Sequence, residues 1–263
     1  MNCRPVWSPD GRNLTYDEGH QIYILSSDGS NQTLLDNSWS PAWSPDGKRV
    51  AFVSRNGTSF QIYRVRVDGT EKELLTYSPS PISSLAWSPD GGKIAFLSST
   101  DTIDEIYVMN ADGSNQRRLT WHWYLLYSLY SKVPCSFSDV LWSPDSSKII
   151  FRYYEKEGDW KLRKFGIGAI NADGTNPVLI ADAQLPTWSP DGTKIAFACE
   201  DGIYIVNADG SNKTQLADGW APVWSPDGTK IAFECEGTIY VINADGSNQK
   251  KLADGWAPAW SPR

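Results

Sequence analysis

The residue types in this chain that could do chemistry are few. Of its 263 residues only two are histidines, His20 and His122, and they lie far apart in the sequence. The sequence contains neither the G-x-S-x-G pattern of a hydrolase nucleophile nor the H-E-x-x-H pattern of a zinc protease. We therefore expect no catalytic residues and no metal-ligating residues. Binding by aromatic side chains is the chemistry that remains, because 13 residues are tryptophan.

The cysteines support the same interpretation. They are Cys3, Cys135, Cys199 and Cys235. None has the C-x-x-C spacing of a zinc or redox motif. Cys199 and Cys235 occupy equivalent positions in successive repeats, and such positions usually lie too far apart for a disulfide. We expect four free thiols.

Composition excludes several classes of partner. The net charge is −7, and 40 % of the residues are hydrophobic. Nucleic acid is not an expected partner, because nucleic-acid binding needs a concentrated basic face. No apolar run reaches the roughly 18 residues of a membrane span. The start, "MNCRPVWSPDG", does not read as a signal peptide, so we expect a cytoplasmic protein, or an exported one if the N-terminus has been trimmed, or a fragment of a longer chain.

One repeat dominates the sequence. The tripeptide W-S-P, in most copies W-S-P-D-G, has its tryptophan at positions 7, 43, 87, 142, 188, 224 and 260. Nine residues after each of the first six tryptophans comes an aromatic residue: Tyr16, Phe52, Phe96, Phe151, Phe197 and Phe233. An "IYIV"-like run and a "NADGSN"-like turn follow in most units. Residues 193–227 and 229–263 are identical at 25 of 35 positions, which is typical of a recent internal duplication.

Each unit predicts four short antiparallel strands. The run before W-S-P is the first, "KIAF" is the second, "IYVMNA" the third and a segment such as "QRRLT" the fourth, with Pro and Gly at the turns. Radial repetition of four-stranded sheets is a β-propeller. We predict an all-β, six-bladed propeller in a single domain over residues 1–263. The expected units are approximately 4–39, 40–83, 84–138, 139–184, 185–220 and 221–256, with a partial unit at 257–263.

The units resemble the WD40-like repeats of the TolB-type propeller family, marked by W-S-P-D-G followed by I-A-F, I-Y and D-G. The resemblance runs from Arg4 to Arg263 and lacks the N-terminal α/β domain of TolB. It implies six blades around a channel. Some propellers of this type are polysaccharide lyases with a metal and a histidine cluster, and others precede peptidase domains. With two histidines and no catalytic domain following, we expect no enzyme.

The last residues, "APAWSPR", repeat a first strand that the chain also supplies near its start. Residues 4–7 and 257–260 therefore compete for one place in blade 1. The C-terminal copy would seal the ring, whereas a surplus copy would add to the edge of another chain. The expected states are thus a monomer or a strand-exchanged oligomer.

The links of each unit fall on two faces. The "SPDG" and "NADGSN" turns share one face, which we call the constant face. The links between second and third strands and between successive units share the other, which we call the variable face; all insertions fall there, and loops on a rigid scaffold usually carry function. The seven W-S-P tryptophans are expected to pack between blades, because a large flat side chain fills that space. Six further tryptophans map to the variable face: Trp39, Trp121, Trp123, Trp160, Trp220 and Trp256.

Trp39, Trp220 and Trp256 each lie four residues before a W-S-P tryptophan. In a closed ring they belong to neighbouring blades, so they could form one aromatic arc at the channel mouth. They could equally cap the hydrophobic layer below them. The insertion over residues 121–138, with Trp121, His122, Trp123 and Tyr124, either closes over the mouth as a lid or packs on blade edges. The hairpin around Trp160 has mixed charge, which is typical of a solvated loop.

Carboxylates also gather near the inner rim: Asp17, Glu18, Glu200, Glu234 and Glu236. We expect these to be unrelated carboxylates on the surface. The alternative is that they bind a cation such as calcium in the channel. We otherwise expect no cofactor.

The sequence thus predicts a non-enzymatic module that binds a protein or peptide through the variable face. The candidate anchors are the three tryptophans of the arc, the lid residues 121–124 and Trp160. The alternatives are a carbohydrate-binding propeller on the same face, a polysaccharide-processing enzyme, and a scaffold without a dedicated ligand.

Overall fold

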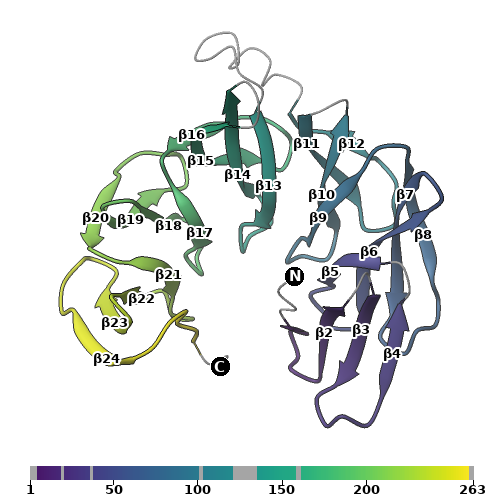
Figure 1. Ribbon diagram of the computed structural model, residues 1–263, viewed down its shortest axis with the longest axis horizontal. Coiled ribbons are helices and arrows are strands. Elements are labelled where there is room, and N and C mark those ends of the chain that lie inside the picture. Colours follow the sequence, from purple (N-terminus) through teal and green to yellow (C-terminus); the bar gives the residue numbers. More distant parts are fainter. Residues whose placement is uncertain are drawn as a thin grey trace. The chain divides into compact units, whose positions relative to one another are not determined.

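Every strand of the protein belongs to a short antiparallel sheet, among the residues that the structure describes (Figure 1). The structure is a computed structural model that describes residues 5–18, 21–35, 38–100, 103–120, 135–157 and 161–260. These residues form six sheets of four strands each, which confirms the predicted all-β propeller blades. Contacts divide the chain into two compact units, Met1–Trp142 and Ser143–Arg263.

The sheets follow one another along the chain. The first, β1-β2-β3-β4, comprises Val6–Trp7, Asn13–Glu18, Gln21–Ser26 and Gln32–Leu35. The second, β5-β6-β7-β8, comprises Ser38–Trp43, Arg49–Asn56, Ser59–Arg66 and Glu73–Ser78. The third, β9 to β12, comprises Ile82–Trp87, Lys93–Thr100, Ile103–Asn110 and Arg117–Arg118.

The remaining three sheets have the same strand order. The fourth, β13-β14-β15-β16, comprises Cys135–Trp142, Lys148–Glu157, Lys161–Asn171 and Val178–Ala181. The fifth, β17-β18-β19-β20, comprises Gln184–Trp188, Lys194–Cys199, Gly202–Asn207 and Thr214–Ala217. The sixth, β21-β22-β23-β24, comprises Trp220–Trp224, Lys230–Cys235, Thr238–Asn243 and Lys250–Asp254.

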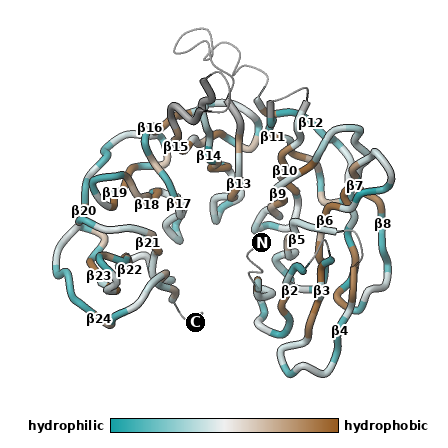
Figure 2. The backbone as a smooth tube through the Cα atoms, viewed as in Figure 1, coloured by the Kyte–Doolittle hydropathy of each residue, from teal (hydrophilic) through white to brown (hydrophobic). Residues whose placement is uncertain are grey.

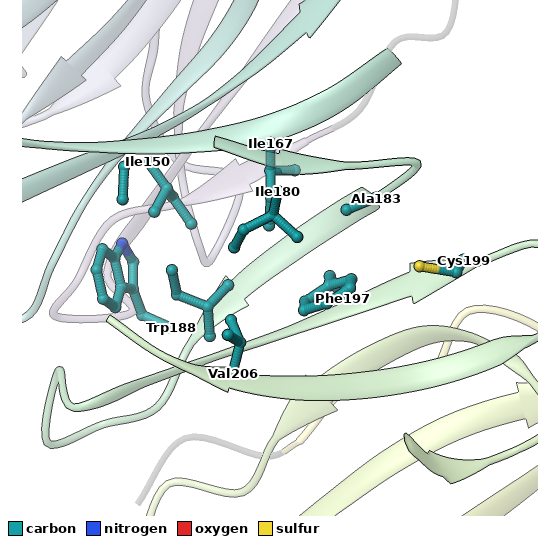
Figure 3. Close-up of a cluster of buried hydrophobic side chains, with 10 residues drawn as sticks. Ile150, Ile167, Ile180, Ala183, Trp188, Phe197, Cys199 and Val206 are labelled. Atoms are coloured by element: carbon teal, nitrogen blue, oxygen red, sulfur yellow. The ribbon is translucent and has the colours of Figure 1, made fainter. Parts of the chain in front are cut away.

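The repeated aromatic of the second strand forms the centre of each core. Phe52, Phe96, Phe197 and Phe233 are fully buried, and each stacks on the tyrosine opposite it in the third strand. Aliphatic side chains from the preceding sheet and from the link after it complete the cluster, as Ile180 of β16 and Ala183 do beside Phe197 in Figure 3. The hydropathy of the backbone follows this arrangement, with apolar residues in the strand interiors and polar ones at the turns (Figure 2). Burying such side chains contributes about 2–3 kcal/mol each.

The "SPDG" sequence forms a turn because the serine hydroxyl makes hydrogen bonds to the aspartate carboxylate and to a backbone amide across the turn. In the fifth sheet Ser189 Oγ donates to Asp191 Oδ1 at 2.6 Å and accepts the amide N–H of Lys194 at 2.9 Å. Gly192 closes the turn with a φ of 69°, a left-handed conformation that favours glycine. The same bonds recur at Ser44 and Ser225, which explains why the motif is repeated.

The turn carboxylates predict an acid-sensitive fold. A serine or threonine hydroxyl, followed by a backbone amide in most cases, lowers the pKa of nine turn aspartates below the ordinary 3.8: Asp10, Asp28, Asp46, Asp68, Asp112, Asp145, Asp191, Asp209 and Asp245. A depressed folded pKa contributes stability above the unfolded value, and this stability is lost as the pH falls through the folded pKa.

We therefore expect urea midpoints to be flat from about pH 7 to 5, as far as these turns contribute, and to fall steeply below about pH 4. Asp191→Asn should reduce this slope, because it removes one titrating group while an amide oxygen can still accept the same bonds. A midpoint that stays constant down to pH 3 would contradict the assignment.

Some of the W-S-P tryptophans link one repeat to the preceding one within the same unit. Three indoles donate to the carbonyl that precedes another W-S-P tryptophan: Trp43 to Val6, Trp142 to Ala86 and Trp260 to Val223, at 3.1, 3.0 and 3.0 Å. The prediction that all seven pack between blades is wrong for Trp7, which is 54 % exposed. In its unit no sheet precedes β1, so nothing there covers this indole.

The two copies of the first strand behave differently. β1 pairs with β2, with Val6 opposite Thr15 and Trp7 opposite Leu14, so the N-terminal copy completes the first sheet. Residues 257–260 form no strand, contrary to the prediction for this segment. They follow β24 without a strand to pair with, and Trp260 is held instead by its indole bond to the carbonyl of Val223.

Candidate functional site

The variable face of the sixth sheet carries two exposed tryptophans. Trp220 begins β21, where it lies opposite Glu234 of β22, and is 36 % exposed. Trp256 follows β24 and is 75 % exposed. Its ring lies over Gly237, in the link between β22 and β23, such that a Cβ on that glycine would be 3.4 Å from Cζ2. Both indoles therefore lie at one end of one sheet.

The backbone below these indoles is tightly organised. The amide of Gly237 donates to the Glu234 carboxylate at 2.6 Å, which fixes the link under Trp256. Gly219, before Trp220, has a φ of 151° and lies so close to Phe233 that a Cβ would be 2.6 Å from the ring. These contacts hold the main chain on either side of the exposed surface, which suits a preformed binding site.

The surroundings of the pair are acidic. Glu234 is buried, whereas Asp218 and Glu236 are exposed. The two exposed carboxylates add a polar, negatively charged rim to the apolar indole surface. Exposed aromatics with a polar rim are typical of interaction sites.

Trp39 is placed differently. It is half-buried in β5, and its indole donates to the Ile82 carbonyl at 3.2 Å. Phe60 contacts it edge to face, with ring centres 6.1 Å apart. These contacts fit the capping role that the sequence also allowed. Trp39 belongs to the first unit and the other two tryptophans to the second, so an arc joining all three stays a prediction.

Several predicted site residues lie outside the described residues: Trp121, His122, Trp123, Tyr124 and Trp160. The same holds for His20 and for the lid assigned to most of 121–138. Their roles stay predictions.

Among the described parts of the chain, no group of three or more His, Cys, Asp or Glu side chains is arranged to hold a metal ion. Of the cysteines, Cys199 and Cys235 are free thiols, and Cys3 and the side chain of Cys135 lie outside the description. Over the same described residues, no helix is long and apolar enough to span a membrane.

A feature that sequence reasoning missed lies between the fifth and sixth sheets. A shallow depression of about 490 Å³ is lined by Gln215, Leu216, Ala217, Asp218, Cys235, Tyr240 and Gln249. The signal for it was present in the alignment of the last two repeats, where Lys213 of one corresponds to Gln249 of the next.

The comparisons with known proteins agree with the fold. Residues 1–120 match the family described as TolB beta propeller domain, whereas no curated protein matches the sequence. The structure is similar to an oligogalacturonate lyase in complex with manganese, with a TM-score of 0.64 and 15 % identity over 90 % of this chain and 75 % of that one.

Two further structures have comparable similarity. TolB from Acinetobacter baumannii has a TM-score of 0.53 and 21 % identity over 97 % of this chain and 64 % of TolB. The β-propeller domain of the Trilobed protease from Pyrococcus furiosus has a TM-score of 0.56 and 17 % identity over 92 % of this chain and 79 % of that one. At these identities the likeness concerns the fold alone. The W-S-P-D-G repeats, the six four-stranded sheets and the family match over residues 1–120 are consistent with a TolB-type β-propeller.

Proposed function

We propose that the protein is a non-enzymatic module that binds a protein segment or peptide through the variable face of its sixth sheet. The observation that carries the proposal is the exposure of Trp256, at 75 %, beside a second exposed indole on the same sheet end. A large aromatic surface in water is costly unless a partner covers it. Tryptophan is also the residue most enriched among the energetic centres of interfaces.

The acidic rim indicates the character of the partner. Asp218 and Glu236 flank the two indoles, and the whole chain carries a net charge of −7. A segment with apolar and basic side chains would bury the indoles and meet the carboxylates with opposite charge. Its association should therefore weaken as salt screens the rim.

The proposal predicts that Trp220→Ala and Trp256→Ala each weaken partner binding by about 30-fold, the effect of losing roughly 2 kcal/mol at a hot spot. Affinity capture with wild type and with the double variant would identify proteins that depend on the indoles, and calorimetry with a captured segment would give the affinities. Trp7→Ala is the matched control, because Trp7 is also exposed, at 54 %, but belongs to β1. Equal retention by wild type and the double variant would contradict the proposal.

Carbohydrate binding is the second candidate, and it has a specific observation in its favour. The Trp256 ring lies over Gly237, so its outer face is open, and an open indole face can stack on a sugar ring. One structural neighbour is an oligogalacturonate lyase. Soluble glycans that quench Trp256 fluorescence with little dependence on salt would favour this candidate over a peptide.

A further inference from the structure

Two sheets use a lysine of their own to cover the stacked aromatic pair. In the second sheet, Lys72 Nζ lies 5.4 Å from the Phe52 ring centre and 4.5 Å from that of Tyr63. In the fifth sheet, Lys213 Nζ lies 5.4 Å from Phe197 and 4.5 Å from Tyr204. The same geometry in two separate units shows that the repeat itself forms a place for an ammonium ion on the tyrosine face.

The sixth sheet keeps the aromatic pair and replaces the lysine. Its pair is Phe233 and Tyr240, stacked with ring centres 5.6 Å apart, against 5.8 Å for the pair of the fifth sheet. The residue that aligns with Lys213 is Gln249. Here Tyr240 and Gln249 line the depression of about 490 Å³.

Glutamine at this position is engaged differently in two other sheets. In the first sheet the Gln32 amide donates to the Tyr16 hydroxyl at 3.1 Å. In the third, Gln116 accepts a bond from the Thr76 hydroxyl at 2.6 Å. The depression of the sixth sheet is therefore a property of that sheet rather than of glutamine at this position.

The charges around the depression favour a cation. In the fifth sheet Lys213 Nζ approaches Cys199 Sγ to 3.8 Å and opposes the rise in the pKa of that thiol, which burial causes. The equivalent thiol, Cys235, has a pKa raised by burial and then by Glu236, Glu234 and Asp218. Gln249 thus stands where the Lys213 charge would be, and Lys251, which lies opposite Tyr240, has its ammonium paired with the Asp254 carboxylate at 2.7 Å.

We propose that this depression binds the primary ammonium group of a lysine side chain supplied by another polypeptide. The ammonium lies on the face of Tyr240, near Cys235 and Asp218, as Lys213 lies on Tyr204 within the chain. The internal lysines identify the ligand class, because they show which side chain the repeat accepts there. The site shares Asp218 with the acidic rim of the proposed function but uses neither Trp220 nor Trp256, so substitutions of these two tryptophans distinguish the two proposals.

The test is a titration followed by backbone amide NMR of the whole chain. The probe is the peptide acetyl-Gly-Lys-Gly-amide, and its matched control carries norleucine in place of lysine. We expect saturable shifts at Tyr240 and Cys235 with the lysine peptide, with weak affinity in about the millimolar range and loss at high salt. The norleucine peptide should leave both amides unmoved. A third titration with n-butylamine distinguishes a free amine from a peptide, since tighter binding of the peptide shows that its backbone contributes.

Three variants make the test specific. Gln249→Lys should fill the site from within and weaken peptide binding by about tenfold or more, whereas Gln249→Ala should leave it open and change affinity less than about twofold. Lys213→Gln should create a second site, seen as new saturable shifts at Tyr204 and Cys199. Circular dichroism confirms that each variant is folded.

The proposal is overturned if Tyr240 does not respond to the lysine peptide in wild type, or if lysine and norleucine peptides shift it equally. Binding that is unchanged in Gln249→Lys would overturn it as well. Loss of binding in Trp220→Ala and Trp256→Ala with the Tyr240 response intact would separate the two sites.

Discussion

Replacing Gly113 with alanine is expected to lower the free energy of unfolding by about 3 kcal/mol, through left-handed backbone strain plus overpacking. Gly113 lies in the turn between β11 and β12 with a φ of 85°. A Cβ there would be 2.3 Å from the carbonyl oxygen of Leu75 and 2.9 Å from its Cα. Leu75 is buried in β8, so backbone rather than a flexible side chain would have to move. Urea denaturation followed by circular dichroism measures the loss.

Gly29→Ala is the matched control for this prediction. Gly29 has the same place in the turn of the first sheet and a φ of 73°, but a Cβ there would meet nothing within 4 Å. It should therefore cost only the backbone strain, about 1 kcal/mol. Equal losses for the two variants would show that the close approach of the second and third sheets at Gly113 is not what restricts this position.

The fold was predictable because each repeat carries its own local signals. Ser189, Asp191 and Gly192 satisfy a turn almost entirely with their own groups, so the pattern can be interpreted without knowing the neighbours. The buried Phe197 and its tyrosine likewise follow from alternation within two adjacent strands. Six recurrences then leave little choice of architecture.

Features that depend on adjacent sheets were predicted less well. Trp7 has the same sequence context as Trp43, yet it is exposed because its unit has no sheet before it. Trp39 and Trp220 have equivalent positions, but Trp39 contacts Phe60 of its own sheet and donates to the Ile82 carbonyl of the next sheet. The position of a residue in the repeat predicts the end of the sheet at which its side chain lies. The exposure of that side chain depends on which residues of the neighbouring sheet contact it.

The depression at Tyr240 is a second feature that the sequence alone did not reveal. Residues 193–227 and 229–263 differ at 10 of 35 positions, and one difference replaces Lys213 with Gln249. On the sequence this is an ordinary change between polar residues. Only the position of Lys213 over Tyr204 shows that the change removes an ammonium from an aromatic face.

Replacing Arg118 with methionine is expected to lower the free energy of unfolding at pH 7 by about 3 kcal/mol, the cost of leaving a buried charge unpaired. Arg118 Nη2 lies 2.7 Å from Glu105 Oε1, and the Thr120 hydroxyl also donates to this carboxylate. Glu105 is only 7 % exposed. Burial raises the pKa of Glu105 even with these partners, which oppose the rise.

The stability loss of Arg118→Met should also depend on pH, which distinguishes an electrostatic cause from a packing defect. A carboxyl whose folded pKa is raised binds its proton more tightly in the folded state, so it stabilises the fold as the pH falls towards its ordinary value. Loss of Arg118 should raise the pKa of Glu105 further, so the deficit of Arg118→Met should shrink from pH 7 to about pH 5. Glu105→Gln in the same chain should recover most of the loss at pH 7, because the neutral amide needs no counter-ion.

A surface arginine provides the control for Arg118→Met. Arg12 is 84 % exposed and lies 3.9 Å from the Asp10 carboxylate, so Arg12→Met should change the free energy of unfolding by no more than about 0.5 kcal/mol. Denaturation of the wild type and the three variants at both pH values compares the two environments directly. If Arg118→Met lowers the free energy of unfolding as little as Arg12→Met does, or if its effect does not depend on pH, then Glu105 is not a buried charge that needs Arg118 as its counter-ion. The aliphatic part of the arginine would then account for its role, through packing against the third sheet.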